Sequence, residues 1–166
     1  MTSAAESSST SAIEGFKSLG MFTADHAVVE SGKVYANGAY WAALRFPAFP
    51  ATLPSCSLVA VVQVPFHLMQ SDHQLRFGLE DADGQPLPLE ITGQFRTALG
   101  LEAKYGESGV SPFAVPIFGL TFERAGDYAF TFAIDGKPLD RYPFHVLQVA
   151  GVGAAIAAPP LPPNDI

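Results

Sequence analysis

Hydrophobic and polar residues alternate one by one along much of the chain from Met21 onward. In the run 127–135, one face carries four large apolar side chains, those of Tyr128, Phe130, Phe132 and Ile134. A shorter run, 75–79, alternates in the same way. Successive side chains of a strand point to opposite faces of a sheet, so this pattern predicts half-buried antiparallel strands. The run 58–64 is apolar except at Gln63 and predicts a central strand covered on both faces.

Turn residues separate these runs and set their number. Ser31-Gly32, Asp83-Gly84 and Asp135-Gly136 each lie between two strand-like runs, and an Asp-Gly pair supplies the positive φ of a tight hairpin. We predict about eight strands, over residues 21–29, 33–45, 57–65, 73–81, 87–97, 114–122, 126–135 and 138–149. Short strands with almost no helix favour an all-β, two-sheet antiparallel sandwich, an immunoglobulin-like or jelly-roll-like Greek key.

Both ends of the chain lack this pattern. Residues 1–20 are rich in Ser, Thr, Ala and Gly, and residues 150–166 in Ala, Gly and Pro. We therefore predict a disordered N-terminal arm and a disordered tail around one β-sandwich domain, residues 21–149. The start has neither the basic nor the apolar region of a secretion signal, and residues 150–158 are too few to span a bilayer. We expect a cytoplasmic protein without membrane insertion.

Composition narrows the partner classes. The 166 residues carry a net charge of −7, and the nine Lys and Arg residues are scattered rather than clustered. A nucleic-acid binder needs basic side chains that displace counterions from phosphate, so we expect no nucleic-acid partner. The single cysteine, Cys56, rules out an internal disulfide. We interpret it as a small buried or loop hydrophobe rather than a reactive thiol.

The histidines and acidic residues form no recognisable catalytic or metal-binding motif. His67 and His73, with Asp72, flank one turn, which we interpret as solvated rather than as a metal site. The remaining histidines, His26 and His145, lie in other predicted strands. The acidic segment 81–84 has side chains that calcium prefers, but hairpin tips select Asp and Gly for turn geometry. We predict no catalytic residue, no cofactor and no metal.

Two connections are longer than a hairpin needs, and ordered loops on a rigid scaffold often carry function. Residues 46–55 contain three prolines, and residues 98–112 include a Gly/Ser-rich stretch. Their apolar side chains are our candidate interaction residues: Phe46, Phe49, Leu53, Leu101 and Tyr105. In the first loop these side chains either pack inward as a lid on the core or form an interaction patch, since proline stiffness lowers the ordering cost of binding.

Several turn and core motifs occur together. They are Gly32-Lys33-Val34-Tyr35, Leu79-Glu80-Asp81-Ala82-Asp83-Gly84, Val115-Pro116-Ile117, Gly126-Asp127-Tyr128 and Ile134-Asp135-Gly136. Over about residues 22–149 they resemble an uncharacterised bacterial family, of actinobacterial type, of stand-alone β-sandwich domains of unknown function. The resemblance implies a β-sandwich in a cytoplasmic setting and brings no activity, ligand or catalytic residue. Tyr128 also resembles the tyrosine corner of Greek-key sandwiches, the alternative being an ordinary core tyrosine.

These observations favour a non-catalytic protein-interaction or assembly module, with a protein partner or self-association. The alternative is a small-ligand-binding β-sandwich with a pocket between its sheets or under residues 46–55, and an enzyme of unknown type ranks third. Edge strands invite pairing unless charge, proline or a cover protects them. Residues 117–122 are apolar and uncharged, so we expect a sheet edge or the 46–55 loop at the contact.

Overall fold

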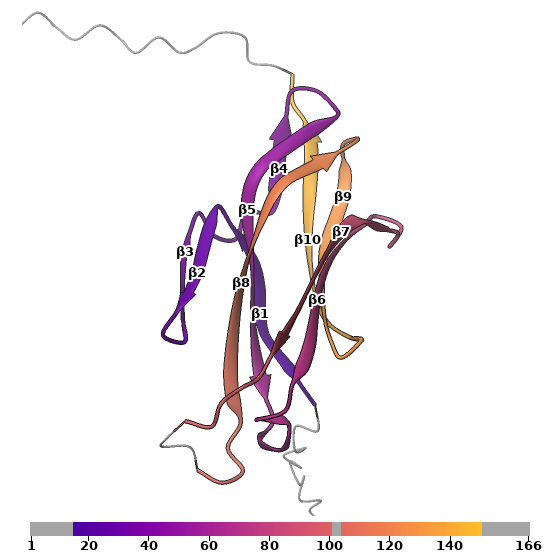
Figure 1. The fold of residues 1–166 in the computed structure, drawn as a ribbon. Helices are drawn as coiled ribbons and strands as arrows, with labels where there is room; N and C mark the ends of the chain where they lie inside the picture. The colour runs from indigo at the N-terminus through magenta and orange to yellow at the C-terminus, as the bar shows by residue number, and fades with distance from the viewer. Residues whose placement is uncertain (1–14, 101–103, 151–166) are drawn as a thin grey trace, which may run out of the picture.

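The computed structural model describes residues 15–100 and 104–150, and this part of the chain is all-β (Figure 1). It contains ten strands and one short 3-10 helix, with no α-helix among the described residues. In chain order the elements are β1 (Lys17–Ala24), β2 (His26–Glu30), β3 (Lys33–Asn37), β4 (Ala43–Phe46), β5 (Ala51–Val64), η1 (Phe66–Leu68), β6 (His73–Asp81), β7 (Pro86–Phe95), β8 (Gly109–Phe122), β9 (Gly126–Ile134) and β10 (Lys137–Gln148).

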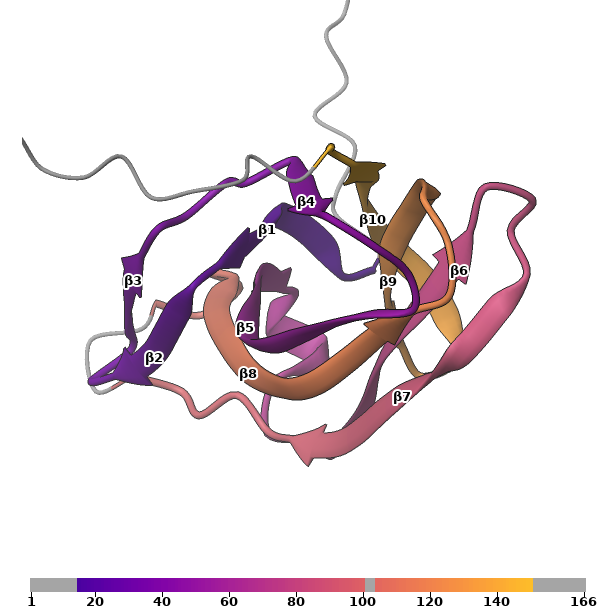
Figure 2. The same cartoon turned by 90° about the horizontal axis from the view of Figure 1, so that it is seen from above.

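Hydrogen bonding divides the strands into three sheets. One has the order β1-β5-β8, the second has the order β4-β10-β9-β6-β7, and β2 pairs with β3 as a separate hairpin. Neighbouring strands are antiparallel except β4, which runs parallel to β10. Viewed from above, the strands of the two larger sheets curve around a common interior (Figure 2). β7 and β8 are each the last strand of their sheet, so each has one unpaired edge.

The prediction of about eight strands is too low because two predicted strands are each split. Residues 21–29 break at Asp25 into the end of β1 and the start of β2. Residues 33–45 break between β3 and β4, where Gly38 and Tyr40 have φ angles of 62° and 63°. The left-handed region is incompatible with a continuing strand. At Tyr40, a non-glycine residue adopts it, which the sequence pattern does not signal.

Two predicted boundaries also differ from the structure. β1 begins at Lys17, which pairs with Gln63 of β5, so the ordered strand starts before residue 21. The segment 46–55 is mostly strand rather than loop, because β5 begins at Ala51, which pairs with Phe122 of β8. Only residues 47–50 connect β4 to β5. The remainder of the predicted arm, 1–14, and the tail from 151 onward lie outside the described residues.

The core lies between the two larger sheets and confirms the face predicted from alternation. Tyr128, Phe130, Phe132 and Ile134 of β9 are all buried in it. From the opposite sheet, β5 contributes five buried side chains, those of Cys56, Leu58, Ala60, Val62 and Val64. The predicted coverage of the second face is confirmed at Val59, whereas Val61 and Gln63 are only partly buried. Val59 points to the other face and packs in a second cluster with Ala24 and Ala27, beside the β2–β3 hairpin.

The alternation of β5 and β8 is interrupted at the same level on both strands. On β8, Ile117 is buried, Phe118 and Gly119 are exposed, and Leu120 and Phe122 are buried again. Gly119 has a φ of 64°, a conformation that glycine adopts without strain. On β5, Pro54 and Ser55 are both exposed between inward residues, and Ser55 pairs with Phe118. We call this feature the paired pleat break, residues 54–55 and 118–119.

A tyrosine corner joins the β8–β9 turn to the core. The Tyr128 hydroxyl donates a hydrogen bond of 2.8 Å to the carbonyl of Arg124, four residues upstream. Its ring packs edge-on against Phe122, with a centroid separation of 5.0 Å. A buried tyrosine whose hydroxyl bonds back to backbone just upstream is the arrangement found in Greek-key sandwiches. The interpretation of Gly126-Asp127-Tyr128 as such a corner is confirmed.

Candidate interaction surface

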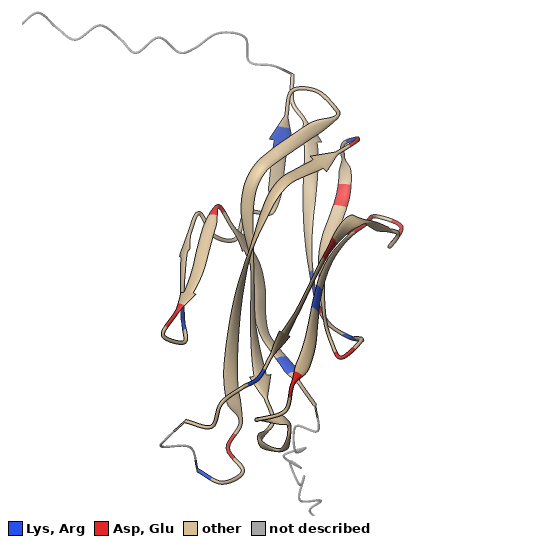
Figure 3. Ribbon diagram, viewed as in Figure 1, with Lys and Arg blue, Asp and Glu red and all other residues tan. Residues whose placement is uncertain are grey.

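Charged side chains are distributed unequally between the two larger sheets (Figure 3). β5 and β8 contain no Lys, Arg, Asp or Glu along their whole length. The outer face of the five-stranded sheet carries charged pairs instead, formed by Arg76 with Glu90, Arg141 with Glu80 and His145 with Asp127. The buried centres of protein interfaces are depleted of charged residues. The side of the molecule built on β5 and β8 is therefore the candidate interaction side.

Phe118 is the main exposed apolar side chain on this side. It is 75% exposed, because it follows the inward Ile117 on β8 and so points away from the core. Val28 of β2 is also exposed, and it lines with Pro116 and Phe118 a hollow of about 400 Å³ between the hairpin and strands β5 and β8. We call this feature the hairpin hollow.

A second depression lies on the other side of Phe118, between the unpaired edges of β7 and β8. This β7–β8 groove has a volume of about 350 Å³. It is mostly apolar, and its walls come from both larger sheets: Leu79, Leu87, Pro88, Leu89, Phe118, Gly119, Leu120, Thr121, Phe122 and Tyr128, with Asp81, Glu123 and Arg124 also lining it. Phe118 lines both the groove and the hairpin hollow, so it forms the ridge between them.

The ionisable residues of the groove gather near the tyrosine corner. Burial raises the pKa of the Tyr128 phenol, Arg124 lowers it, and Asp81 and Glu123 raise it, with a net rise. These three charges therefore surround one phenol. Asp83 follows in the adjoining turn, where its backbone N–H donates to the Asp81 carboxylate at 3.0 Å. The lining at this end therefore has two carboxylates, those of Asp81 and Glu123, against the single guanidinium of Arg124, so its net charge is negative.

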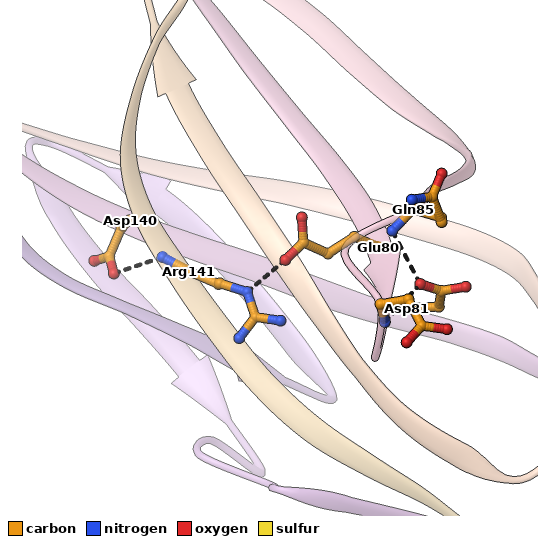
Figure 4. A network of polar contacts seen from close by, with 6 residues as sticks. Glu80, Asp81, Gln85, Asp140 and Arg141 are labelled. Atoms are coloured by element: carbon orange, nitrogen blue, oxygen red, sulfur yellow. Dashed lines mark hydrogen bonds and ion pairs between the residues drawn. The ribbon is translucent and has the colours of Figure 1, made fainter.

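The segment 81–84 forms a tight turn. Asp81 Oδ1 also accepts the Gln85 N–H at 2.9 Å, the Asx-type arrangement that such tips select (Figure 4). In the same view, Arg141 of β10 donates to Glu80 of β6, the residue before Asp81. This ion pair crosses β9 on the outer face of the five-stranded sheet. It is half exposed and contributes little to stability, but it keeps both charges away from the groove.

His73 is buried, and each of its two ring nitrogens has a hydrogen-bond partner. Its Nδ1 lies 2.7 Å from Asp135 Oδ2, and its Nε2 lies 2.7 Å from the carbonyl oxygen of Leu68. Burial lowers its pKa, but the Leu68 carbonyl and the Asp135 carboxylate raise it more, so the net pKa is raised. Both partners are acceptors, which requires a proton on each ring nitrogen. The geometry therefore favours an imidazolium that joins η1, the start of β6 and the β9–β10 turn.

Two of the groups weighed as metal ligands, His73 and Asp72, have other partners. His73 is bonded as above, and Asp72 accepts two hydrogen bonds from Arg96, at 2.8 and 2.7 Å. In residues 15–100 and 104–150, no group of three or more His, Cys, Asp and Glu side chains is placed to hold a metal ion.

Cys56 lies in the core and is expected to be unreactive. Burial raises the pKa of its thiol to about 11, with a smaller contribution from Asp25. The thiolate is the nucleophile, so little of the reactive form exists near neutral pH. We expect native protein at pH 8 to react with a disulfide reagent at least about a hundredfold more slowly than protein unfolded in guanidinium. Absorbance of the released thiol measures both rates, and equal rates would contradict the buried position.

The sequence-based candidate residues lie in different places. Phe46, Phe49 and Leu53 are half-buried and pack against the core, with Phe46 and Phe49 in edge-on contact at 6.1 Å. Tyr105 is 95% exposed and contacts the ring of Phe66. Leu101 lies outside the described residues. Their role in an interaction stays a prediction. The four that the structure describes, Phe46, Phe49, Leu53 and Tyr105, line neither the β7–β8 groove nor the hairpin hollow.

Phe118 was not among the sequence-based candidates. The sequence does predict the strand that carries it, because residues 117–122 are uncharged and form an unprotected strand. Strict alternation predicts that Phe118 faces outward and Gly119 inward, whereas both face outward in the structure. The sequence signal for this irregularity is the glycine itself, which interrupts a run of larger side chains.

The fold and surface together define an all-β chain with an uncharged, apolar side and a charged side. Residues 19–147 match a family of unknown function, DUF6941, and the chain belongs to that family. No curated protein matches the sequence. Among solved structures, the crystal structure of the C-terminal domain of wzt is 14% identical, with a TM-score of 0.43 over 87% of this chain and 84% of that chain. No helix in the described residues has the length and apolar character needed to cross a membrane.

Proposed function

We propose that this chain is a non-catalytic protein-interaction module whose contact is centred on Phe118. The observation that carries the proposal is the position of this ring. It is 75% exposed on an uncharged strand, and it separates the mostly apolar β7–β8 groove from the hairpin hollow, whose lining is mixed. Contiguous exposed apolar surface marks interaction sites, and an aromatic ring at the centre of an interface is a frequent source of binding energy.

Finer features of the chain belong to the same proposal. The core shared by the two larger sheets supports a sandwich of immunoglobulin-like or jelly-roll-like type. A free buried cysteine fits a reducing compartment, so we place the protein in the cytoplasm. We also propose that it acts as a stand-alone bacterial domain.

A pair of charge insertions tests the proposal. Phe118→Asp places a carboxylate at the centre of the contact, while Thr92→Asp places the same group on the exposed outer face of β7. We expect partner proteins cross-linked in cells of the source organism to fall at least about tenfold with Phe118→Asp and to persist with Thr92→Asp, because desolvating an unpaired charge disfavours binding. Quantitative mass spectrometry measures the yield, and circular dichroism checks the fold. Equal recovery with both variants would rule out Phe118 as the centre.

A small-ligand-binding module is the second candidate. The observation that favours it is the volume of the β7–β8 groove, about 350 Å³, which lies at the lower end of the range for ligand pockets. Such a ligand would occupy the apolar walls and approach the Tyr128 hydroxyl or Arg124. It would raise the melting temperature because it binds the native state. A substitution that fills the groove with a larger side chain would reduce this rise more than Phe118→Asp does.

A further inference from the structure

We propose that the partner of the β7–β8 groove is an extended segment of another protein, with alternating apolar residues and a Lys or Arg at one end. This segment adds as a strand to the free edge of β8 along Ile117–Phe122. The inference rests on the proposed function and specifies its partner. Strand addition combines backbone hydrogen bonds with pockets for alternate side chains, and the groove offers both.

Prolines determine which part of the β8 edge is open. β8 pairs with β5 on one side only. Pro112 and Pro116 lie opposite Val61 and Ser57 of β5. A strand tolerates proline where the backbone N–H would otherwise point to the unpaired edge, so these two positions face the free edge of β8. The first half of the edge therefore lacks donors at these positions. Ile117–Phe122 contains neither proline nor charge, and this stretch lines the groove.

The opposite wall supplies packing instead of pairing. At the groove end of β7, Pro86 and Pro88 have no N–H to donate. Between and beside them, Leu87 and Leu89 are half-buried and face the groove. A strand lying in the groove would therefore form its hydrogen bonds with β8 and place apolar side chains on these leucines.

Thr121 is the backbone donor that the partner strand would meet. Side-chain direction and hydrogen-bond direction alternate together along a strand. After the paired pleat break, Leu120 and Phe122 point inward and Thr121 points outward. Thr121 thus occupies the same kind of position as Pro112 and Pro116, but it retains its N–H. Its hydroxyl contacts Thr52 at 3.0 Å and does not enter the core.

Charge identifies the partner as another protein with a basic residue. The groove ends at Asp81, Glu123 and Arg124, with Asp83 in the adjoining turn. A Lys or Arg on the partner would face this acidic end, and opposite charges speed association and fix register. A second copy of the chain brings a further net charge of −7, so like-charge repulsion disfavours it.

Two synthetic peptides and two variants of the full chain test the inference. One peptide alternates valine and threonine after two lysines, and the other is identical except for two glutamates in their place. We expect the lysine peptide to bind at least about tenfold more tightly at low ionic strength, with the difference shrinking in high salt. Fluorescence anisotropy measures both affinities. Thr121→Pro removes both the backbone N–H at the free edge and the side-chain hydroxyl. Thr121→Val removes only the hydroxyl and keeps the N–H, so it is the matched control.

The expected result is binding of the lysine peptide that survives Thr121→Val and falls at least about tenfold with Thr121→Pro, with both variants folded by circular dichroism. Failure to bind, equal affinity for the two peptides, or equal binding to both variants would overturn strand addition. Self-association that Thr121→Pro abolishes would overturn the choice of another protein. If partner cross-linking still depends on Phe118 while the peptide result fails, the proposed function stands and only the strand partner is wrong.

Discussion

Phe130→Ala is expected to lower the free energy of unfolding by about 3–5 kcal/mol, the usual cost of truncating a buried phenylalanine. Phe130 is completely buried on β9 and stacks on Phe144 of β10 with a centroid separation of 4.9 Å. Removing the ring leaves a cavity that its neighbours in a two-sheet core fill only in part. Urea unfolding followed by tryptophan fluorescence measures the change.

Thr131→Ala is the matched control for this substitution. Thr131 follows Phe130 on the same strand, but it lies on the outer face of the five-stranded sheet and is only partly buried. Thr131 lies between the buried Ala129 and Ala133, and its truncation removes fewer buried atoms than that of Phe130, so we expect a cost of about 1 kcal/mol. Equal costs for the two variants would mean that both faces of β9 contribute equally or that its register differs from the one described.

The second expectation concerns pH. His73 has a raised pKa in the folded protein, relative to a usual value of 6.5. The native state therefore binds this proton more tightly than the unfolded state does. Its contribution to stability is fully present below about pH 6.5 and is lost as the pH rises through the folded pKa. Unfolding in urea at pH 5.5 and pH 8.5 should show the protein to be less stable at the higher pH.

Substitution separates His73 from other groups that titrate in this range. His73→Gln should lower stability at pH 5.5 by about 2–3 kcal/mol, the value for hydrogen bonds to a charged group, and should flatten the fall towards pH 8.5. His145→Gln removes a histidine that is bonded to Asp127 but exposed, so it should change the profile little. Nitrogen NMR shifts that show a ring more than half protonated at pH 6.5 would support the mechanism directly. A mostly neutral ring at that pH, or an unchanged profile in His73→Gln, would contradict it.

Local alternation predicted the interior well where strands are regular. β6 has the predicted bounds 73–81, and β9 ends one residue before the predicted 135. In both strands every second residue faces the core, and each strand is followed by a turn that contains Asp and Gly. The pattern failed where one residue leaves the extended region, as at Tyr40 with its φ of 63°. Nothing in the side chain of a tyrosine indicates that conformation.

The groove was beyond sequence reasoning for a different reason. Its two walls come from β7 and β8, which are consecutive in the chain but belong to different sheets. Consecutive strands usually pair, so the default expectation would have closed this edge. The charge-poor run 117–122 was visible as an unprotected strand. Its position opposite Leu87 and Leu89 follows only from the strand order.

The paired pleat break constrains how β5 and β8 can change in length. In each strand the inward-facing residues have odd numbers before the level where Ser55 faces Phe118 and even numbers after it. A single-residue deletion in one strand would send every following side chain of that strand to the wrong face. Deletions in both strands at this level would cancel and leave an unbroken alternation. Homologues that lack the glycine are therefore expected to have lost a residue near Pro54 as well, whereas the side chain at position 118, between inward Ile117 and Leu120, still faces outward.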